Sequence, residues 1–62
     1  MEKQKFYLVA ADALPEVFLR VAEAKRMLQV GEAATVGDAA RQVGISRSAF
    51  YKYKDAVQPF QN

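Results

Sequence analysis

Residues 35–54, TVGDAARQVGISRSAFYKYK, decide how the rest of this chain folds, because two short apolar patterns meet there at Gly44. Thr35 three residues before Asp38 is typical of a helix start, in which the hydroxyl accepts the Asp38 N–H and the carboxylate reaches back. Glycine adopts the left-handed conformation without steric cost, so Gly44 indicates where that helix ends. The first pattern therefore predicts a helix over residues 36–43.

The second pattern predicts another helix over residues 47–57. Ser46 is a good N-cap, and Ile45 can pack onto Phe50 across the first turn. Neither helix is long enough to be stable alone, so each must pack on the other. Small, apolar and glycine residues at these offsets predict a helix-turn-helix, whose second helix lies in the DNA major groove in known examples. The alternative is an ordinary helical hairpin with a glycine turn.

The outward face of this second helix carries the candidate functional residues. It combines three cations with two serines and a tyrosine, before the acid Asp55: Ser46, Arg47, Ser48, Tyr51, Lys52 and Lys54. Arg47 can donate two hydrogen bonds to a guanine edge, the serines can meet bases or phosphate, and Tyr51 can meet phosphate or a thymine methyl group. Lys52 and Lys54 suit the phosphate backbone. We therefore predict that these six residues bind DNA, the alternative for each being a solvated side chain.

The composition indicates one small domain over residues 1–62. Apolar residues make up 52% of the chain, too many for a disordered tail. Cysteine and histidine are absent, which excludes disulfides and the common zinc sites, and no calcium-loop or phosphate-loop motif is present. We therefore expect no metal and no cofactor. No apolar run could span a membrane and no signal peptide precedes the first helix, so we expect no membrane partner and a cytoplasmic location.

The net charge of +2 lies entirely in the second half of the sequence. Residues 1–34 hold as many acids as cations, whereas residues 35–62 hold four cations and two acids. This excess is too small for tight non-specific DNA binding by one copy, and two copies would double it.

The N-terminal segment Phe6–Ala10 has strong strand character, being aromatic and β-branched. A single strand cannot satisfy its own backbone groups. It either pairs with the same strand of another chain or packs as an extended arm over the helices, and we favour pairing, because a lone apolar arm would aggregate. The sequence thus predicts a mainly α fold, with a short N-terminal β-strand at residues 6–10 and a homodimer formed through it and the first helix.

The first helix is predicted over residues 14–30, with Pro15 in its first turn and Gly31 as its terminator. One broad apolar face is expected to pack on the later helices: Leu14, Val17, Phe18, Val21, Ala24 and Leu28. Three further apolar residues lie off this stripe, either as scattered surface groups or as a second buried face in an oligomer: Leu19, Met27 and Val30. Three charged residues are expected to form ordinary exposed pairs: Arg20, Glu23 and Arg26.

After the second short helix, Pro59 prevents continuation, and residues 58–62 are expected to be an uncapped end, as in a chain cut at a linker.

Three stretches resemble a bacterial family of small ACT-domain-containing proteins, described as PheB-like: residues 6–9 (FYLV), Asp12 with residues 14–16 (LPE), and residues 46–55 (SRSAFYKYKD). The resemblance covers nearly the whole chain, and the last stretch is its most specific part. In that family the segment is followed by an ACT domain, a ferredoxin-like module that typically binds amino acids and dimerises. The resemblance therefore implies an N-terminal helix-turn-helix segment whose ACT domain is absent, so that an amino-acid effector would act only through the missing C-terminal domain.

Residues 43–46 and 50–53 also resemble the DNA-reading segment of TetR-type repressors, which supports helix-turn-helix geometry alone. The preceding strand departs from that family.

The leading interpretation is a DNA-binding module of an amino-acid-responsive transcriptional regulator, acting as a dimer on double-stranded DNA. The alternative is a dimerisation or protein-interaction module of an ACT-domain regulatory protein that does not bind DNA. Some members of the resembling family have been labelled chorismate mutase. The sequence provides no convergent acid–base set, however, so we expect no enzymatic activity and no catalytic residues.

Overall fold

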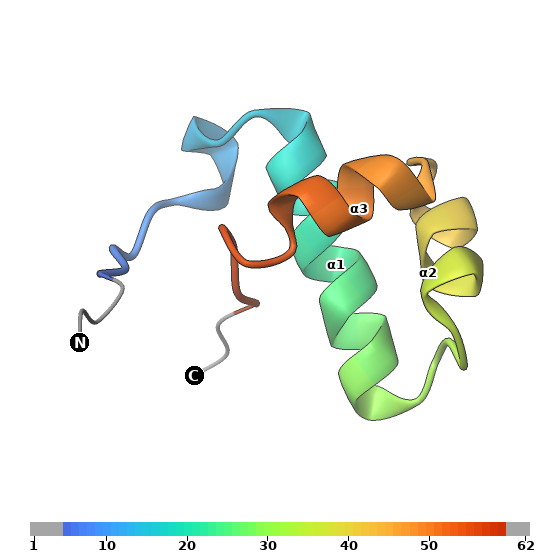
Figure 1. The fold of residues 1–62 in the computed structure, drawn as a ribbon. Coiled ribbons are helices and arrows are strands. Elements are labelled where there is room, and N and C mark those ends of the chain that lie inside the picture. Colours follow the sequence, from blue (N-terminus) through green and yellow to red (C-terminus); the bar gives the residue numbers. More distant parts are fainter. Residues whose placement is uncertain (1–4, 60–62) are drawn as a thin grey trace, which may run out of the picture.

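The computed structural model describes residues 5–59 of the chain. Within this range, a 3-10 helix is followed by three α-helices: η1 (Ala11–Ala13), α1 (Glu16–Val30), α2 (Val36–Val43) and α3 (Arg47–Tyr53). Figure 1 shows α2 and α3 packed against α1, while η1 and the N-terminal arm extend to the opposite side. The predicted mainly α class is confirmed for this part of the chain. Residues 60–62, part of the predicted uncapped end, lie outside the described residues.

The N-terminal arm, residues 5–10, forms neither helix nor strand. The strand predicted at residues 6–10 is therefore wrong for the single chain. A strand exists only when a neighbouring strand pairs with its backbone, and the described residues of this chain supply none. Instead, Tyr7 and Leu8 are 80% and 76% exposed, so the arm does not pack over the helices either.

Helix α1 ends where the sequence predicts and begins two residues later. Leu14 and Pro15 are both extended, with ψ angles of 147° and 149°, because a residue before proline is disfavoured in the helical conformation. Pro15 is thus the N-cap rather than part of the first turn. At the other end Gly31 is left-handed, with φ at 83°, and donates its N–H to the Met27 carbonyl.

Helix α2 has the predicted bounds, and both short helices begin with the predicted caps. The Thr35 hydroxyl oxygen accepts the Asp38 N–H at 3.1 Å, and Ser46 accepts the Ala49 N–H at the same distance. The Asp38 carboxylate accepts a hydrogen bond from Arg41 instead of completing a capping box. Gly44 is left-handed with φ at 84°, as predicted.

Helix α3 is shorter than predicted, because it ends at Tyr53 rather than at residue 57. Residues 54–56 form a turn in which the Ala56 N–H donates to the Tyr53 carbonyl at 2.9 Å. Beyond the helix, the carbonyls of Lys54 and Val57 accept hydrogen bonds from a side chain of α1.

The core is built largely from alanine, which allows the helices to approach closely. Its buried members are Val21, Ala24, Met27, Ala33, Ala39, Ala40 and Phe50. Ala40 is 1% exposed, as expected of a small residue between helix backbones, and the rings of Phe18 and Tyr53 meet edge to face at 5.0 Å. Met27, predicted to lie off the apolar stripe, is 6% exposed. The connector after α1 folds back over it, with the Ala33 N–H donating to the Met27 carbonyl at 3.2 Å.

Candidate nucleic-acid interface

Helix α3 turns one side toward the core and the other toward solvent. Phe50 is 4% exposed and Tyr53 is half-buried, which anchors the inner side against α1. Five of the six predicted DNA-binding residues are exposed together on the outer side and at the helix start: Ser46, Arg47, Ser48, Tyr51 and Lys52. We call these five residues the α3 face. Positions three to four residues apart lie side by side on a helix, so Arg47 and Tyr51 are neighbours, as are Ser48 and Lys52.

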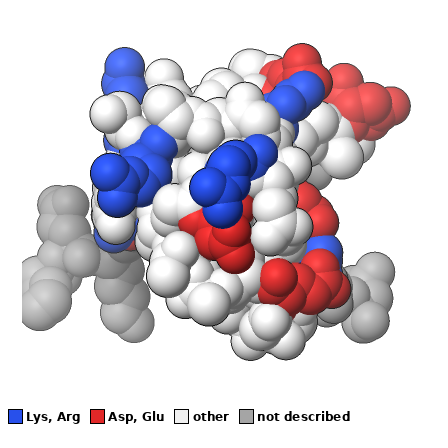
Figure 2. Space-filling model, turned by 90° about the vertical axis from the view of Figure 1, so that its right-hand side faces the viewer, with Lys and Arg blue, Asp and Glu red and all other residues white. Residues whose placement is uncertain are grey.

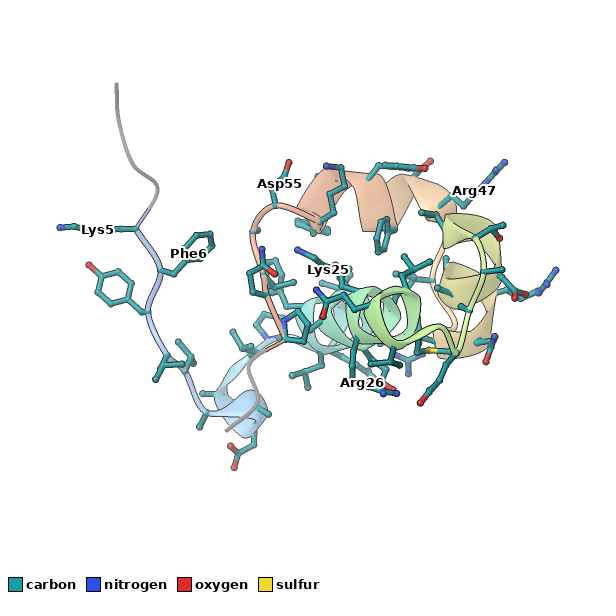
Figure 3. The ribbon with its side chains drawn as sticks, turned by 90° about the horizontal axis from the view of Figure 1, so that it is seen from below. Lys5, Phe6, Lys25, Arg26, Arg47 and Asp55 are labelled. Carbon is teal, nitrogen blue, oxygen red and sulfur yellow. The ribbon has the colours of Figure 1, made fainter. Side chains whose placement is uncertain are left out.

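Arg47 stands at the start of α3 and points outward (Figure 3). Its aliphatic stem lies along the first turn of α2, because a Cβ atom on Gly37 would be 3.4 Å from the Arg47 Cδ. The small residue at position 37 therefore leaves room for the arginine stem beside α2. Among the ion pairs of the described residues, none involves Arg47 or Lys52.

The other two long side chains of the α3 face each make one ring contact. The Tyr51 ring meets Phe50 edge to face, with centroids 5.6 Å apart, yet Tyr51 remains 55% exposed. The Lys52 amine lies 5.3 Å from the centre of the Tyr53 ring, within the range of a cation–π contact. Tyr51 and Lys52 both remain exposed, and the Lys52 ammonium would have to leave the Tyr53 ring to reach a phosphate.

Lys54, the sixth predicted residue, is separated from the others. It follows the end of α3, is half-buried, and its amine lies 3.2 Å from the Asp55 carboxylate. A paired and partly covered ammonium is less available to phosphate than Arg47 or Lys52. Ser46 also has a structural duty, since its oxygen caps α3, although its hydroxyl hydrogen remains available to donate.

The charge on this side of the molecule is mixed. Figure 2, a view onto the α2 side, shows Lys and Arg side chains at the left and centre and most Asp and Glu side chains toward the right. Arg41 on α2 is 80% exposed but pairs with Asp38 at 2.7 Å. In the described part of residues 35–62, Arg47 and Lys52 are therefore the cations outside any ion pair.

Two cations of α1 have structural roles that the sequence did not predict. Arg20, predicted to form only an exposed pair, also donates from Nη1 to the Val43 carbonyl at 2.6 Å, while Glu16 accepts from its Nε at 3.1 Å. The Lys25 amine donates to the carbonyls of Lys54 and Val57. The only signal for Lys25 was its place beside Ala24 on the border of the apolar stripe.

Arg26 forms a separate cluster on α1, where it bridges Glu23 at 2.6 Å and Glu32 at 2.9 Å. Hydrogen bonds from Arg26 lower the pKa of both glutamates, and the two carboxylates raise the pKa of the guanidinium. The cluster ties the end of α1 to the connector that leads to α2, and no cation of this cluster lies on α3.

In residues 5–59, no group of acidic side chains is arranged to hold a metal ion. Likewise, none of the helices in this range has the length and apolar character needed to cross a bilayer.

In its described part, the chain is a three-helix unit in which α2, a turn at residues 44–46 and α3 form a helix-turn-helix arrangement. No protein-family model and no solved structure matches the chain. Proteins named UPF0735 ACT domain-containing protein do match it. Those of Acetivibrio thermocellus and Carboxydothermus hydrogenoformans are 59% identical over 56 residues and 57% identical over 60 residues. That of Geobacillus kaustophilus is 54% identical over 61 residues.

These matches cover 90%, 97% and 98% of this chain, and 38%, 41% and 41% of the respective relatives. The chain therefore spans about two-fifths of the length of the relatives it matches. The resemblance to ACT-domain-containing proteins is confirmed by these names, which describe no activity and no DNA target.

Proposed function

We propose that this chain is a double-stranded-DNA-binding module that acts as a dimer and serves an amino-acid-responsive regulator of transcription. The observation that carries the proposal is the α3 face, where Arg47 and Lys52 stand outside any ion pair beside two serines and a tyrosine. Helix α3 has seven residues and a diameter of about 10–12 Å with its side chains, which fits a major groove about 12 Å wide.

The residues of the α3 face would share the recognition. Arg47 would donate to the edge of a guanine, and Ser48 would meet a base or a phosphate beside it. Lys52 would contact phosphate, and the Tyr51 hydroxyl would donate to phosphate or its ring would contact a thymine methyl group. Lys54 would contribute only after leaving Asp55, so we rank it below the others.

A dimer would place two α3 helices in successive major grooves about 34 Å apart. The support for a dimer is the N-terminal arm, whose Phe6 and Val9 are also about half exposed, at 54% and 51%. We propose that residues 6–10 pair with the same residues of a second copy, which would satisfy their backbone groups and cover these side chains. An amino-acid effector would act through the ACT domain that the names of the relatives describe.

The test is fluorescence anisotropy with mixed-sequence duplex DNA across a salt series. On mixed-sequence DNA Arg47 has no fixed guanine partner and would meet phosphate instead, so Arg47 and Lys52 together would neutralise two phosphates per copy. The plot of log K against log salt should then have a slope of about −1.8 for one copy and about −3.6 for a dimer. Arg47→Gln and Lys52→Gln should each weaken binding and make the slope shallower by about 0.9 per copy. Arg26→Gln, which removes the same charge on the side of α1 away from α3, is the matched control and should leave the slope unchanged (Figure 3). Equal effects of all three variants, or no binding by the wild type, would refute the proposal.

The second candidate is a dimerisation or protein-interaction module that does not bind DNA. It is favoured by an apolar groove of about 500 Å³ between the N-terminal arm, α1 and the C-terminal segment, lined by Leu8, Leu14, Leu19, Ala22, Val57 and Pro59 among others. Amide NMR shifts that stay unchanged on adding DNA, together with a stable dimer by sedimentation, would select this candidate over the first.

A further inference from the structure

We infer that Arg20 and Lys25 are positioning residues, through which α1 sets the orientation of α2 and α3 and hence of the α3 face. The consequence for DNA binding rests on the function proposed above. The geometric part, the orientation of α2 and α3 by these two cations, does not depend on DNA binding. Each of the two cations holds the carbonyl end of one of the two short helices.

Lys25 holds the end of α3. Its amine lies 2.5 Å from the Lys54 carbonyl oxygen and 2.8 Å from the Val57 carbonyl oxygen, residues 29 and 32 positions away in the sequence. Figure 3 shows the side chain reaching from α1 toward the segment that follows α3. Lys54 is the C-cap of α3, and the last carbonyls of a helix lack intrahelical partners and carry partial negative charge, so an ammonium there both satisfies and attracts them. The bond to Val57 fixes the segment that follows the helix.

Arg20 holds the end of α2 in the same way. Its Nη1 donates at 2.6 Å to the carbonyl of Val43, the last residue of α2, directly before the Gly44 turn. Glu16, one turn earlier on α1, accepts from the other side of the guanidinium and so fixes its plane. The contact is compatible only with a residue that lacks a side chain at position 44, since a Cβ atom there would be 2.6 Å from this nitrogen.

Polar contacts of this kind add direction to a small apolar core. Four of the seven buried residues that the structure describes are alanines, beside Val21, Met27 and Phe50. Arg20 and Lys25 are five residues apart, which places their backbone positions about 7.5 Å apart along α1. Each contact is directional and ties one of the two short helices to α1 at its carbonyl end, and the turn at Gly44 joins the two helices, so the pair is tied to α1 at two points.

The experiment compares Lys25→Met with Lys52→Met, which removes the same charge from the α3 face. If Lys25 positions α3, its variant should bind duplex DNA about tenfold more weakly, because loss of a charged hydrogen bond depopulates the competent orientation. Its salt slope should match the wild type, whereas Lys52→Met should lose about 0.9 per copy. Lys25→Arg, which keeps a charged donor, should restore most of the affinity. Unchanged affinity in Lys25→Met, or a slope as shallow as that of Lys52→Met, would overturn the inference.

A second measurement decides the geometric part without DNA. The ¹³C carbonyl shifts of Lys54 and Val57 and the amide shifts of Arg47 and Tyr51 should move in Lys25→Met while circular dichroism at 222 nm retains the helical signal. Changes confined to the immediate sequence neighbours of Lys25 would overturn the inference. If Lys25→Met unfolds, the same shifts are measured in Lys25→Arg, which keeps a charged donor. Shift changes in Lys25→Arg should then be limited to the residues around Lys54 and Val57. Changes spread over the whole chain would overturn the inference. If the wild type binds no DNA while these shifts move as expected, the proposed function fails and the positioning role stands.

Discussion

Replacing Gly44 by alanine tests whether the turn and the Arg20 contact act together. The left-handed backbone at Gly44, with φ at 84°, costs an alanine about 1 kcal/mol. The new Cβ atom would also lie 2.6 Å from the Arg20 Nη1. The guanidinium is the flexible end of its side chain, so it would move aside and lose its hydrogen bond to the Val43 carbonyl, worth about 1–2 kcal/mol. The free energy of unfolding should therefore fall by about 2–3 kcal/mol.

Gly31→Ala is the matched control for this prediction. Gly31 has nearly the same φ, 83°, but nothing lies within 4 Å of the position of its Cβ atom. Gly31→Ala should therefore lower the free energy of unfolding by only about 1 kcal/mol. Urea unfolding followed at 222 nm measures both values, and in a domain of this size 1 kcal/mol corresponds to a change in Tm of about 4–8 °C. In an Arg20→Met background the cost of Gly44→Ala should shrink to that of Gly31→Ala. Equal costs of the two glycine variants in the wild-type background would refute the coupling between turn and arginine.

Two further predictions concern local contacts. Ser46→Ala removes the acceptor of the Ala49 N–H and should lower the free energy of unfolding by about 1 kcal/mol. Ser48 is exposed at the second position of α3, so Ser48→Ala should stay within about 0.5 kcal/mol of the wild type. Thermal denaturation measures both values. Arg26 lowers the pKa of Glu23 and Glu32 in the folded state. The contribution of these ion pairs to the free energy of unfolding is therefore complete above the ordinary glutamate pKa of about 4.3, and it is lost as the pH falls below that value. The difference in Tm between the wild type and Arg26→Gln should therefore disappear toward acid pH. A difference that persisted there would contradict the ionic origin.

The features that the sequence predicted well are those set by neighbouring residues. The caps at Thr35 and Ser46 and the terminators at Gly31 and Gly44 depend on hydrogen bonds that span only a few positions, and all four lie where they were expected. The exposure of the α3 face was predictable for a similar reason, because helical periodicity places it opposite the apolar side chains once Phe50 faces the core.

The features that the sequence predicted badly depend on partners far away in the chain. Helix α3 was expected to continue to residue 57 but ends at Tyr53, and the carbonyl of its C-cap residue Lys54 is bonded by Lys25 of α1, a contact that no local pattern connects with Lys54. Met27 was placed off the apolar stripe because the periodicity of α1 takes no account of the connector that folds over it. Whether residues 6–10 become a strand depends on a partner outside the chain, and no property of those residues alone decides it.

The same reasoning explains why cations of α1 carry so much of this architecture. The buried residues of the described core are Val21, Met27, Phe50 and four alanines, and a domain of this size gains only a small margin of stability from hydrophobic burial. Each short helix ends in carbonyls that must find donors, and α1 supplies a donor to each from Arg20 and Lys25. Because these two charges are consumed inside the fold, they are withheld from any polyanion. In the described part of α2 and α3 and the turns around them, the cations outside ion pairs are Arg47 and Lys52, so the proposed DNA binding would depend on a second copy to be strong.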